Sequence, residues 1–349
     1  MSGLQSPPMT RAFNGRHLAM AAAVLALIAV PYAIPEGYYV NIASQILLYA
    51  IFAMGLNVLV GYAGLVSLGH AGLFGIAAYV VAYLLAAGHS HTVAILAALV
   101  ISLVSTAGFA ALSLRASGIS FIMITLALGE IIWGVAYRWI SLTNGDNGIS
   151  VATRPAPFGF SLSSATGFYY ATLIVFLLAM AAVAIFVRSP LGAALCGTRD
   201  QPRRMNALGY HVWMIRFCAF MFSGLLTAVA GVLFVYYTEF ISPQALALTA
   251  SAEGLLMVIS GGAGTLLGPV FGAALVVIVK NVVSAYVTRW NFMLGAIFVA
   301  IVVFMPEGFV PGAVRLARAA WRKRGRSRPA IAIAESRPCT EHMNVEREP

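Results

Sequence analysis

Four ionisable residues interrupt long apolar segments of this 349-residue chain: His70, Glu130, Glu253 and Lys280. Ionisable side chains at membrane depth are costly, and they mark proton relays, ion pathways or buried pairs. A proton relay is one chemistry that such residues could perform, and Glu130 is its best candidate because it lies in the middle of its apolar run. The alternatives are structural: Glu130 pairs inside the bundle, His70 is a satisfied packing residue, and Glu253 reaches water near the outer end of its segment.

The sequence offers no motif for chemistry on nucleotides or metals. A P-loop requires a glycine-rich turn that ends in Lys-Ser or Lys-Thr, and the only two lysines, Lys280 and Lys323, lie in no such pattern. Cys196, Cys218 and Cys339 lack the spacing of metal ligands or of a disulfide framework. We therefore expect no metal, no bound cofactor and no ATPase activity in this chain. Any energy from ATP must then come from a separate subunit, and the competing source is an ion gradient.

The polar stretch Arg188–Tyr210 carries four arginines between the apolar runs Tyr169–Val187 and Val212–Tyr237. Short loops rich in Lys and Arg stay in the cytoplasm. Ser189-Pro190 favours a helix start, with serine as the N-cap and proline at the first helical position. We predict a short amphipathic helix that a partner protein can bind on the cytoplasmic side.

The composition indicates a membrane protein. Hydrophobic residues make up 61% of the chain and charged residues only 9%, far from the roughly 25% charged residues of soluble domains. Each crossing needs about 20 mainly apolar residues, and the eighth run is too short to cross alone. The expected runs are His17–Ile34, Asn41–Val60, His70–Ala87, Thr92–Leu114, Ile119–Ile140, Tyr169–Val187, Val212–Tyr237, Thr249–Ser260, Leu266–Ala285 and Asn291–Val310. The predicted fold is an all-α, polytopic transmembrane helical bundle of about ten segments, some of them short or broken.

The placement of the net charge of +10 argues against nucleic acid and for a membrane surface. The cations gather in the head, at Arg115, in the central loop and in the tail, which lie on one side of the membrane if the number of spans is even. We expect a cytoplasmic segment 1–16, a transmembrane domain 17–312 with an extracytoplasmic loop 141–168, and a basic, largely disordered cytoplasmic tail 313–349. The tail should contact anionic lipid headgroups.

A short internal sequence repeat suggests two related halves. Gly61-Tyr-Ala-Gly64 recurs as Gly261-Gly-Ala-Gly264. Backbone breaks at membrane depth are tolerated only where protein or a water-filled cavity satisfies the amides, so paired breaks point to a transport path. The alternative is close helix packing through small residues. The path candidates, with polar neighbours of the first break included, are Asn57, Gly61, Gly64, Ser67, His70, Glu130, Gly261 and Gly264.

The segment Gly55–Gly75, GLNVLVGYAGLVSLGHAGLFG, closely resembles the signature segment of branched-chain amino acid ABC transporter permeases. Ile124–Ile132 and the loop Thr143–Ile149 resemble the LivM-type subunit rather than its LivH-type sister. The resemblance extends over roughly Asn41–Gly312 and includes Ser189-Pro190-Leu-Gly192 in the arginine-rich loop. The sequence departs from the family at position 202, where proline replaces a usual acidic residue, and the loop is therefore expected to be shorter or kinked there.

The resemblance implies the permease subunit of an ABC importer in a bacterial inner membrane, with branched-chain amino acids as cargo. It implies a LivH-type permease homologue, two cytoplasmic ABC ATPases that use ATP, and an extracytoplasmic substrate-binding protein as partners. The arginine-rich loop, 188–211, then resembles the coupling helix that docks on an ATPase. Its candidate contact residues are Arg188, Ser189, Pro190, Gly192, Arg199, Asp200, Arg203, Arg204, Ala207, Leu208 and Gly209.

Other functions stay open on the sequence. Members of the same permease family move urea, short amides or other small solutes. A self-contained, proton-coupled carrier would use the intramembrane ionisable residues, and a scaffold subunit would have no path and no polar groups near the breaks.

Overall fold

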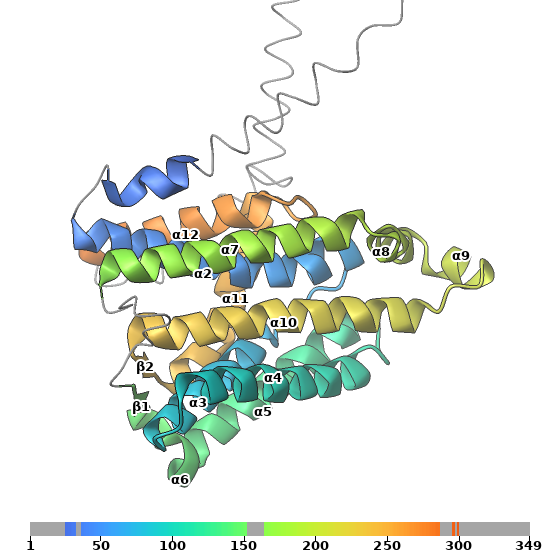
Figure 1. Cartoon of the computed structure of the whole chain (residues 1–349). Helices are drawn as coiled ribbons and strands as arrows, with labels where there is room; N and C mark the ends of the chain where they lie inside the picture. The colour runs from blue at the N-terminus through green and yellow to red at the C-terminus, as the bar shows by residue number, and fades with distance from the viewer. Residues whose placement is uncertain (1–24, 33–35, 152–163, 287–294, 297–298, 300–349) are drawn as a thin grey trace, which may run out of the picture. The chain divides into compact units, whose positions relative to one another are not determined.

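The computed structural model describes residues 25–32, 36–151, 164–286, 295–296 and 299. All of them belong to the compact unit Met1–Gly312, so the predicted tail, 313–349, lies outside the described residues. Figure 1 shows that the described chain is almost wholly helical. Its largest elements are α2 (Gly37–Asn57), α3 (His70–Ala86), α4 (His91–Ser113), α5 (Ile119–Arg138), α7 (Ala165–Arg188), α10 (Val212–Thr238), α11 (Leu248–Gly261) and α12 (Gly268–Tyr286).

The helices follow the apolar runs closely. Of the ten predicted runs, eight coincide with one of these helices to within a few residues. The first run, His17–Ile34, is described only at 25–32, which is helical, and the last, Asn291–Val310, lies almost wholly outside the described residues. Five helices among the described residues are long and apolar enough to cross a membrane, so the chain is a multi-pass membrane protein, and the count of about ten segments stays a prediction.

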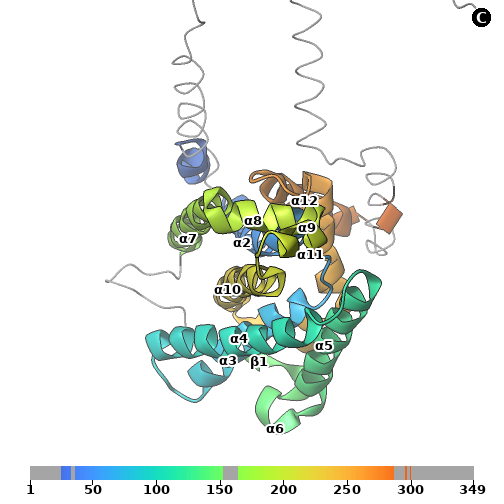
Figure 2. The ribbon, with the colours of Figure 1, turned by 90° about the vertical axis from the view of Figure 1, so that its right-hand side faces the viewer.

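Two helices form the centre of the bundle. Each long helix has a most apolar stretch of 18 residues, and the buried share of that stretch differs between helices. The share is 83% in α2 together with the π-helix η1 (Val58–Ala63) and 61% in α10, against 33% in α4, 28% in α7 and 22% in α5. Helices that are apolar on every side are expected in such buried positions. In both views, α10 runs between the group of α2, α7 and α12 and the group of α3, α4 and α5 (Figures 1 and 2).

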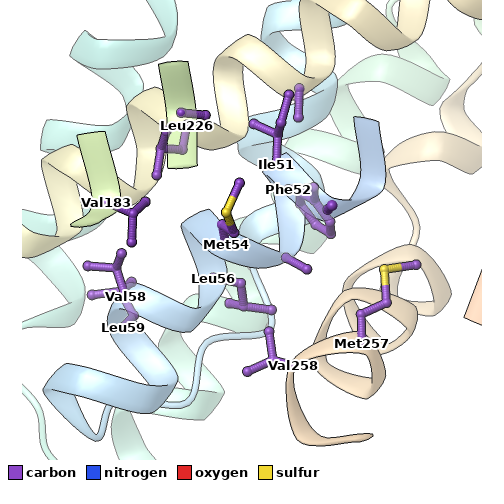
Figure 3. Close-up of a cluster of buried hydrophobic side chains, with 14 of the residues drawn as sticks. Ile51, Phe52, Met54, Leu56, Val58, Leu59, Val183, Leu226, Met257 and Val258 are labelled. Carbon is purple, nitrogen blue, oxygen red and sulfur yellow. The ribbon is translucent and has the colours of Figure 1, made fainter. Parts of the chain in front are cut away.

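The core consists of aliphatic and aromatic side chains that α2 directs toward its neighbours. Figure 3 shows Met54 and Leu56 of α2 in this cluster, with Val183 of α7, Leu226 of α10 and Met257 of α11 around them. The side chains of Met54 and Leu56 are fully buried. Because α2 is buried on all sides, the other helices pack against it.

Both predicted glycine-broken segments are breaks in the backbone. After Asn57, α2 continues as η1, which ends at Gly64 in the left-handed region, with φ of 69°. A π-helix inside a span is rare and is frequently found at functional sites. In the second copy α11 ends at Gly261, and Gly264 again has a positive φ, of 78°. α12 then begins at Gly268.

The predicted loop helix is present and broken at proline. α8 (Pro190–Asp200) begins at the Ser189 N-cap, whose Oγ accepts a hydrogen bond from the Gly192 amide at 3.2 Å. α9 (Pro202–Ala207) follows after Gln201, which leaves the helical region with φ of −146° and ψ of 82°. The cap and the kink at Pro202 are therefore confirmed.

Short elements occupy the opposite end of the bundle from α8 and α9 (Figure 1). They are α6 (Ile140–Thr143), the 3-10 helix η2 (Gly145–Asn147), β1 (Ile149–Ser150), β2 (Phe240–Ile241) and the 3-10 helix η4 (Pro243–Leu246). β1 pairs with β2 in antiparallel register, with Ile149 opposite Ile241. The first part of the predicted outer loop is thus tied to the end of α10.

Candidate functional site

The two glycine breaks contact each other through one asparagine. The Nδ2 of Asn57 donates to the carbonyl oxygen of Thr265 at 2.9 Å, and its Oδ1 accepts from the amide of Gly264 at 2.9 Å. Asn57 is 1% exposed, and buried backbone groups at a break need such partners. Its side chain therefore satisfies one donor and one acceptor that the second break leaves unpaired.

The backbones of the two breaks also approach closely. A Cβ atom placed on Gly61 would overlap the backbone nitrogen and Cα of Gly264. One placed on Gly261 would overlap the carbonyl of Gly268 at the start of α12. Only glycine fits at these positions, as the packing interpretation required. The structure thus brings Asn57, Gly61 and Gly264 into one site, and whether cargo passes there stays a prediction.

An arginine from the predicted coupling loop reaches the first break. Arg199, in the last turn of α8, donates from Nη1 to the carbonyl oxygen of Gly61 at 2.7 Å and from Nε to Asp200 at 3.0 Å. A Cβ atom on Gly64 would lie 2.6 Å from Arg199 Cγ. The sequence assigned Arg199 and Gly61 to separate sites, but they form one contact.

Two further contacts hold α8 against the bundle. Arg216 of α10 donates from Nη2 to the carbonyl oxygen of Thr198 at 2.9 Å, and a cation at the C-terminal carbonyls of a helix is favourable. At the other end of α8, Ser189 donates its hydroxyl to the Phe186 carbonyl at 2.6 Å, while a Cβ on Gly192 would overlap the last carbonyls of α7. α8 is therefore a fixed part of the described structure rather than a loose loop.

The remaining charged residues of the loop are exposed. Arg188, Arg203 and Arg204 are exposed, and none of the residues of α9 is buried. Gly209 follows the end of α9 with φ of 87°, the left-handed conformation that closes many helices. The remaining predicted contact residues are also exposed: Pro190, Asp200, Ala207 and Leu208. They form a surface that a second protein can reach, and its role in ATPase coupling stays a prediction.

His70 is a satisfied buried residue. Its ring lies 2.8 Å from Ser67 Oγ through Nδ1 and 3.0 Å from Ser223 Oγ through Nε2, with no exposed surface. Ser223 donates its only hydroxyl hydrogen to the Gly55 carbonyl at 2.6 Å, so it accepts from a protonated Nε2. The neutral ring then satisfies both of its nitrogens, which agrees with a packing role for His70 and Ser67.

The position of Glu130 differs from the sequence prediction. The sequence predicted that this carboxylate faces the interior of the bundle, whereas it is exposed on the outer face of α5 in this chain. The buried face of α5 is formed at four-residue spacing by Phe121, Thr125 and Gly129, and Gly129 packs on Gly69. Since apolar side chains lie on every side of α5, the sequence pattern could not indicate which side is covered.

Glu253 and Lys280 form an ion pair that sequence reasoning missed. Lys280 Nζ lies 3.1 Å from each carboxylate oxygen of Glu253. The two residues were weighed separately because 27 positions and the second glycine break separate them. The hairpin of α11 and α12 brings them together, which no short-range pattern indicates.

Comparisons with known proteins match the chain to one family of transport proteins. The model of a family described as branched-chain amino acid transport system / permease component matches residues 38–302. The chain is 29% identical over 321 residues to the high-affinity branched-chain amino acid transport system permease protein LivM of Salmonella typhimurium, covering 84% of this chain and 74% of the relative.

Two further relatives are similar over most of their length. LivM of Escherichia coli K12 is 28% identical over 84% of this chain and 75% of the relative. The permease protein LivH of the same system in Escherichia coli K12 is 25% identical over 75% of this chain and 91% of the relative. No solved structure matches the chain.

Proposed function

The chain belongs to the family of branched-chain amino acid transport permease components, and from this membership we propose that it is the LivM-type membrane subunit of an ABC importer for branched-chain amino acids. The higher identity to LivM than to LivH relatives supports the subunit type. In this proposal the chain provides part of the translocation path, binds no cofactor, and relies on two cytoplasmic ABC ATPases for the hydrolysis of ATP.

The observation that carries the proposal is the contact between α8 and the first glycine break. A motor bound to the exposed arginines of α8 and α9 would act on a rigid element, because Ser189 and Arg216 fix both ends of α8. Movement of α8 would then reach the backbone of η1 through the bond from Arg199 to the Gly61 carbonyl. A scaffold subunit has no need of such a connection.

The same geometry supports alternating access as the mechanism. The first break is tied to the second through Asn57, so a displacement of Gly61 also shifts the connection between α11 and α12. Packed interfaces of this kind have discrete arrangements rather than continuous ones. Closure of the ATPases selects one arrangement and their reopening the other, and no bond in the cargo changes.

The remaining partners can be assigned to other faces of the chain. We place the LivH-type homologue against α5, whose outer face exposes Met123 and Ile131 beside Glu130. The extracytoplasmic binding protein meets the end that carries β1, β2 and η4, and lipids cover the remaining apolar faces.

The test separates docking from coupling. Replacement of Arg188, Arg203 and Arg204 by Gln should abolish co-purification of the ATPases and ATP-driven leucine uptake in vesicles. Arg199→Gln should leave the ATPases bound and hydrolysing ATP but lower uptake about ten-fold or more, because it removes a charge-assisted hydrogen bond worth about 1.5–3 kcal/mol. Arg138→Gln is the matched control, because this arginine is also exposed but lies in the last turn of α5, outside the arginine-rich loop.

Two results contradict the proposal. If all four loop arginines can be neutralised without loss of bound ATPase and of uptake, α8 and α9 are no coupling site. If collapse of the proton gradient stops uptake while ATP is present, the chain acts as a proton-coupled carrier, and Glu130→Gln should then abolish its activity as well.

A further inference from the structure

A cavity of about 380 Å³ lies on the side of the bundle opposite to α8 and α9, between α2, α3, α10, α11 and α12. Phe240 of β2 and Gln244 next to it, in η4, line its outer end. Its volume falls within the range of roughly 300–1,000 Å³ that is typical of small-molecule sites. Neither the arginine loop nor the paired glycine breaks contribute to it.

One wall of the cavity is aromatic. The ring centroids of Phe52 and Phe74 are 5.3 Å apart, and those of Phe74 and Phe234 are 5.2 Å apart. Tyr49 continues the wall, with its ring 6.5 Å from Phe234. These rings come from α2, α3 and α10, whose close packing fixes their positions. They offer a rigid apolar surface to an aliphatic side chain.

The ion pair of Glu253 and Lys280 lines the same cavity. Their side chains are 16% and 31% exposed, so the charges are partly removed from water but remain within reach of a ligand. Gly254 lets α11 approach α2, because a Cβ there would overlap the ring of Phe52. The carboxylate is thus brought next to the aromatic wall.

We propose that this cavity binds a zwitterionic amino acid with an apolar side chain. The α-carboxylate of the ligand accepts from the Lys280 ammonium, the α-ammonium donates to Glu253, and the side chain packs on Phe52 and Phe74. The inference rests on the proposed function and deepens it, since it gives the permease its own recognition site for the cargo.

Charge balance selects the zwitterion. The paired side chains carry no net charge together, and a ligand with one positive and one negative end preserves that balance when it enters. A ligand with a single charge leaves one charge without a partner in a site that is partly shielded from water, which is unfavourable. A neutral amide or urea lacks both ion contacts. The site therefore distinguishes amino acids from the other solutes that this permease family could carry.

The test measures protection of a cysteine in the assembled importer. In a variant with Cys196, Cys218 and Cys339 replaced by Ser, Thr249→Cys introduces a thiol at an exposed position that lines the cavity. Leucine at millimolar concentration should slow its alkylation by a small maleimide several-fold. Neither 4-methyl-2-oxopentanoate, which lacks the ammonium, nor leucinamide, which lacks the carboxylate, should do so. Ser150→Cys, exposed at the same end but outside the cavity, should show no protection.

Single neutral substitutions should switch this preference. Glu253→Gln leaves a net positive site, so 4-methyl-2-oxopentanoate should protect in place of leucine. Lys280→Gln leaves a net negative site, so leucinamide should protect. A purely structural ion pair predicts no protection by any of the three compounds in any variant, and that result overturns the proposed site.

Uptake measured in parallel separates the two proposals. ATP-driven leucine uptake without cysteine protection leaves the importer assignment intact and removes the cavity as a cargo site. Protection by leucine in an importer that takes up no amino acid would contradict the assigned transport while leaving the binding site in place.

Discussion

The two glycine breaks share a sequence spacing but differ in what surrounds them. Gly64 and Gly264 adopt nearly the same left-handed conformation, with φ of 69° and 78°. Before Gly64 the chain is a π-helix inside a deeply buried span, whereas before Gly264 it is the end of a 14-residue helix. At the first break the Gly61 carbonyl accepts a hydrogen bond from Arg199 of the arginine-rich loop, and at the second the Gly264 amide donates to Asn57, which directly precedes the first break.

The difference shows how a repeated motif takes on unequal roles. The repeated Ala-Gly dipeptide at the end of each copy sets the local turn, because a left-handed residue without a Cβ atom is unstrained. The partners then distinguish the two copies. The first break is hydrogen-bonded both to the arginine-rich loop and, through Asn57, to the second break. Substitutions at the two breaks should therefore have different consequences, and three predictions test this.

The largest effect is expected for Gly61→Leu. The added Cβ overlaps the backbone of Gly264, which cannot rotate away as a side chain could. Overpacking ordinarily costs about 1–3 kcal/mol, and backbone against backbone lies at or above the upper end. We expect loss of folded, monodisperse protein in detergent. Gly134→Leu on α5, where a Cβ would meet nothing within 4 Å, should leave the yield unchanged, and an undiminished yield of Gly61→Leu would contradict the contact between the breaks.

Asn57→Ala should have a smaller effect. It leaves the Gly264 amide and the Thr265 carbonyl without partners, and each unsatisfied buried group costs about 1–3 kcal/mol. The melting temperature should fall clearly, and Asn57→Asp, which keeps the acceptor for Gly264, should recover part of the loss. Ser105→Ala is the control, because its hydroxyl bond to Ile101 is exposed. A melting temperature no lower than that of the control would mean that the two breaks do not depend on the Asn57 bridge.

The smallest expected effect is a difference in ATP-driven uptake between the variants Gly64→Ala and Gly264→Ala. Both should cost about 1–2 kcal/mol through the left-handed backbone, as should Gly88→Ala, whose φ is 84° and whose Cβ would meet nothing within 4 Å. Only at Gly64 does the added atom displace Arg199. ATP-driven uptake should therefore fall further in Gly64→Ala than in Gly264→Ala at similar melting temperatures. In an Arg199→Ala background that excess should disappear, and its persistence would exclude Arg199 as the relay.

The sequence predicted what local chemistry determines. Span positions follow from runs of apolar residues, the start of α8 follows from Ser189-Pro190, and its end follows from Pro202. Contacts between distant segments were not predictable in this way. Arg199 meets Gly61 across 138 positions, and the side of α5 that carries Glu130 depends on which helices cover it. Of the candidate site, the glycine breaks were therefore recognised and their partners were not.

The outward carboxylate of Glu130 affects the stability of the chain in the membrane before it is assembled with a partner. On insertion scales, a carboxylate at the centre of a span costs about 2.5–3.5 kcal/mol when hydrocarbon surrounds it. The chain carries this cost for as long as the outer face of α5 meets lipid, and loses it when another polypeptide covers that face. If the LivH-type homologue covers that face, as proposed above, an unassembled subunit should be less stable in the bilayer than an assembled one, and membrane proteases should degrade it faster.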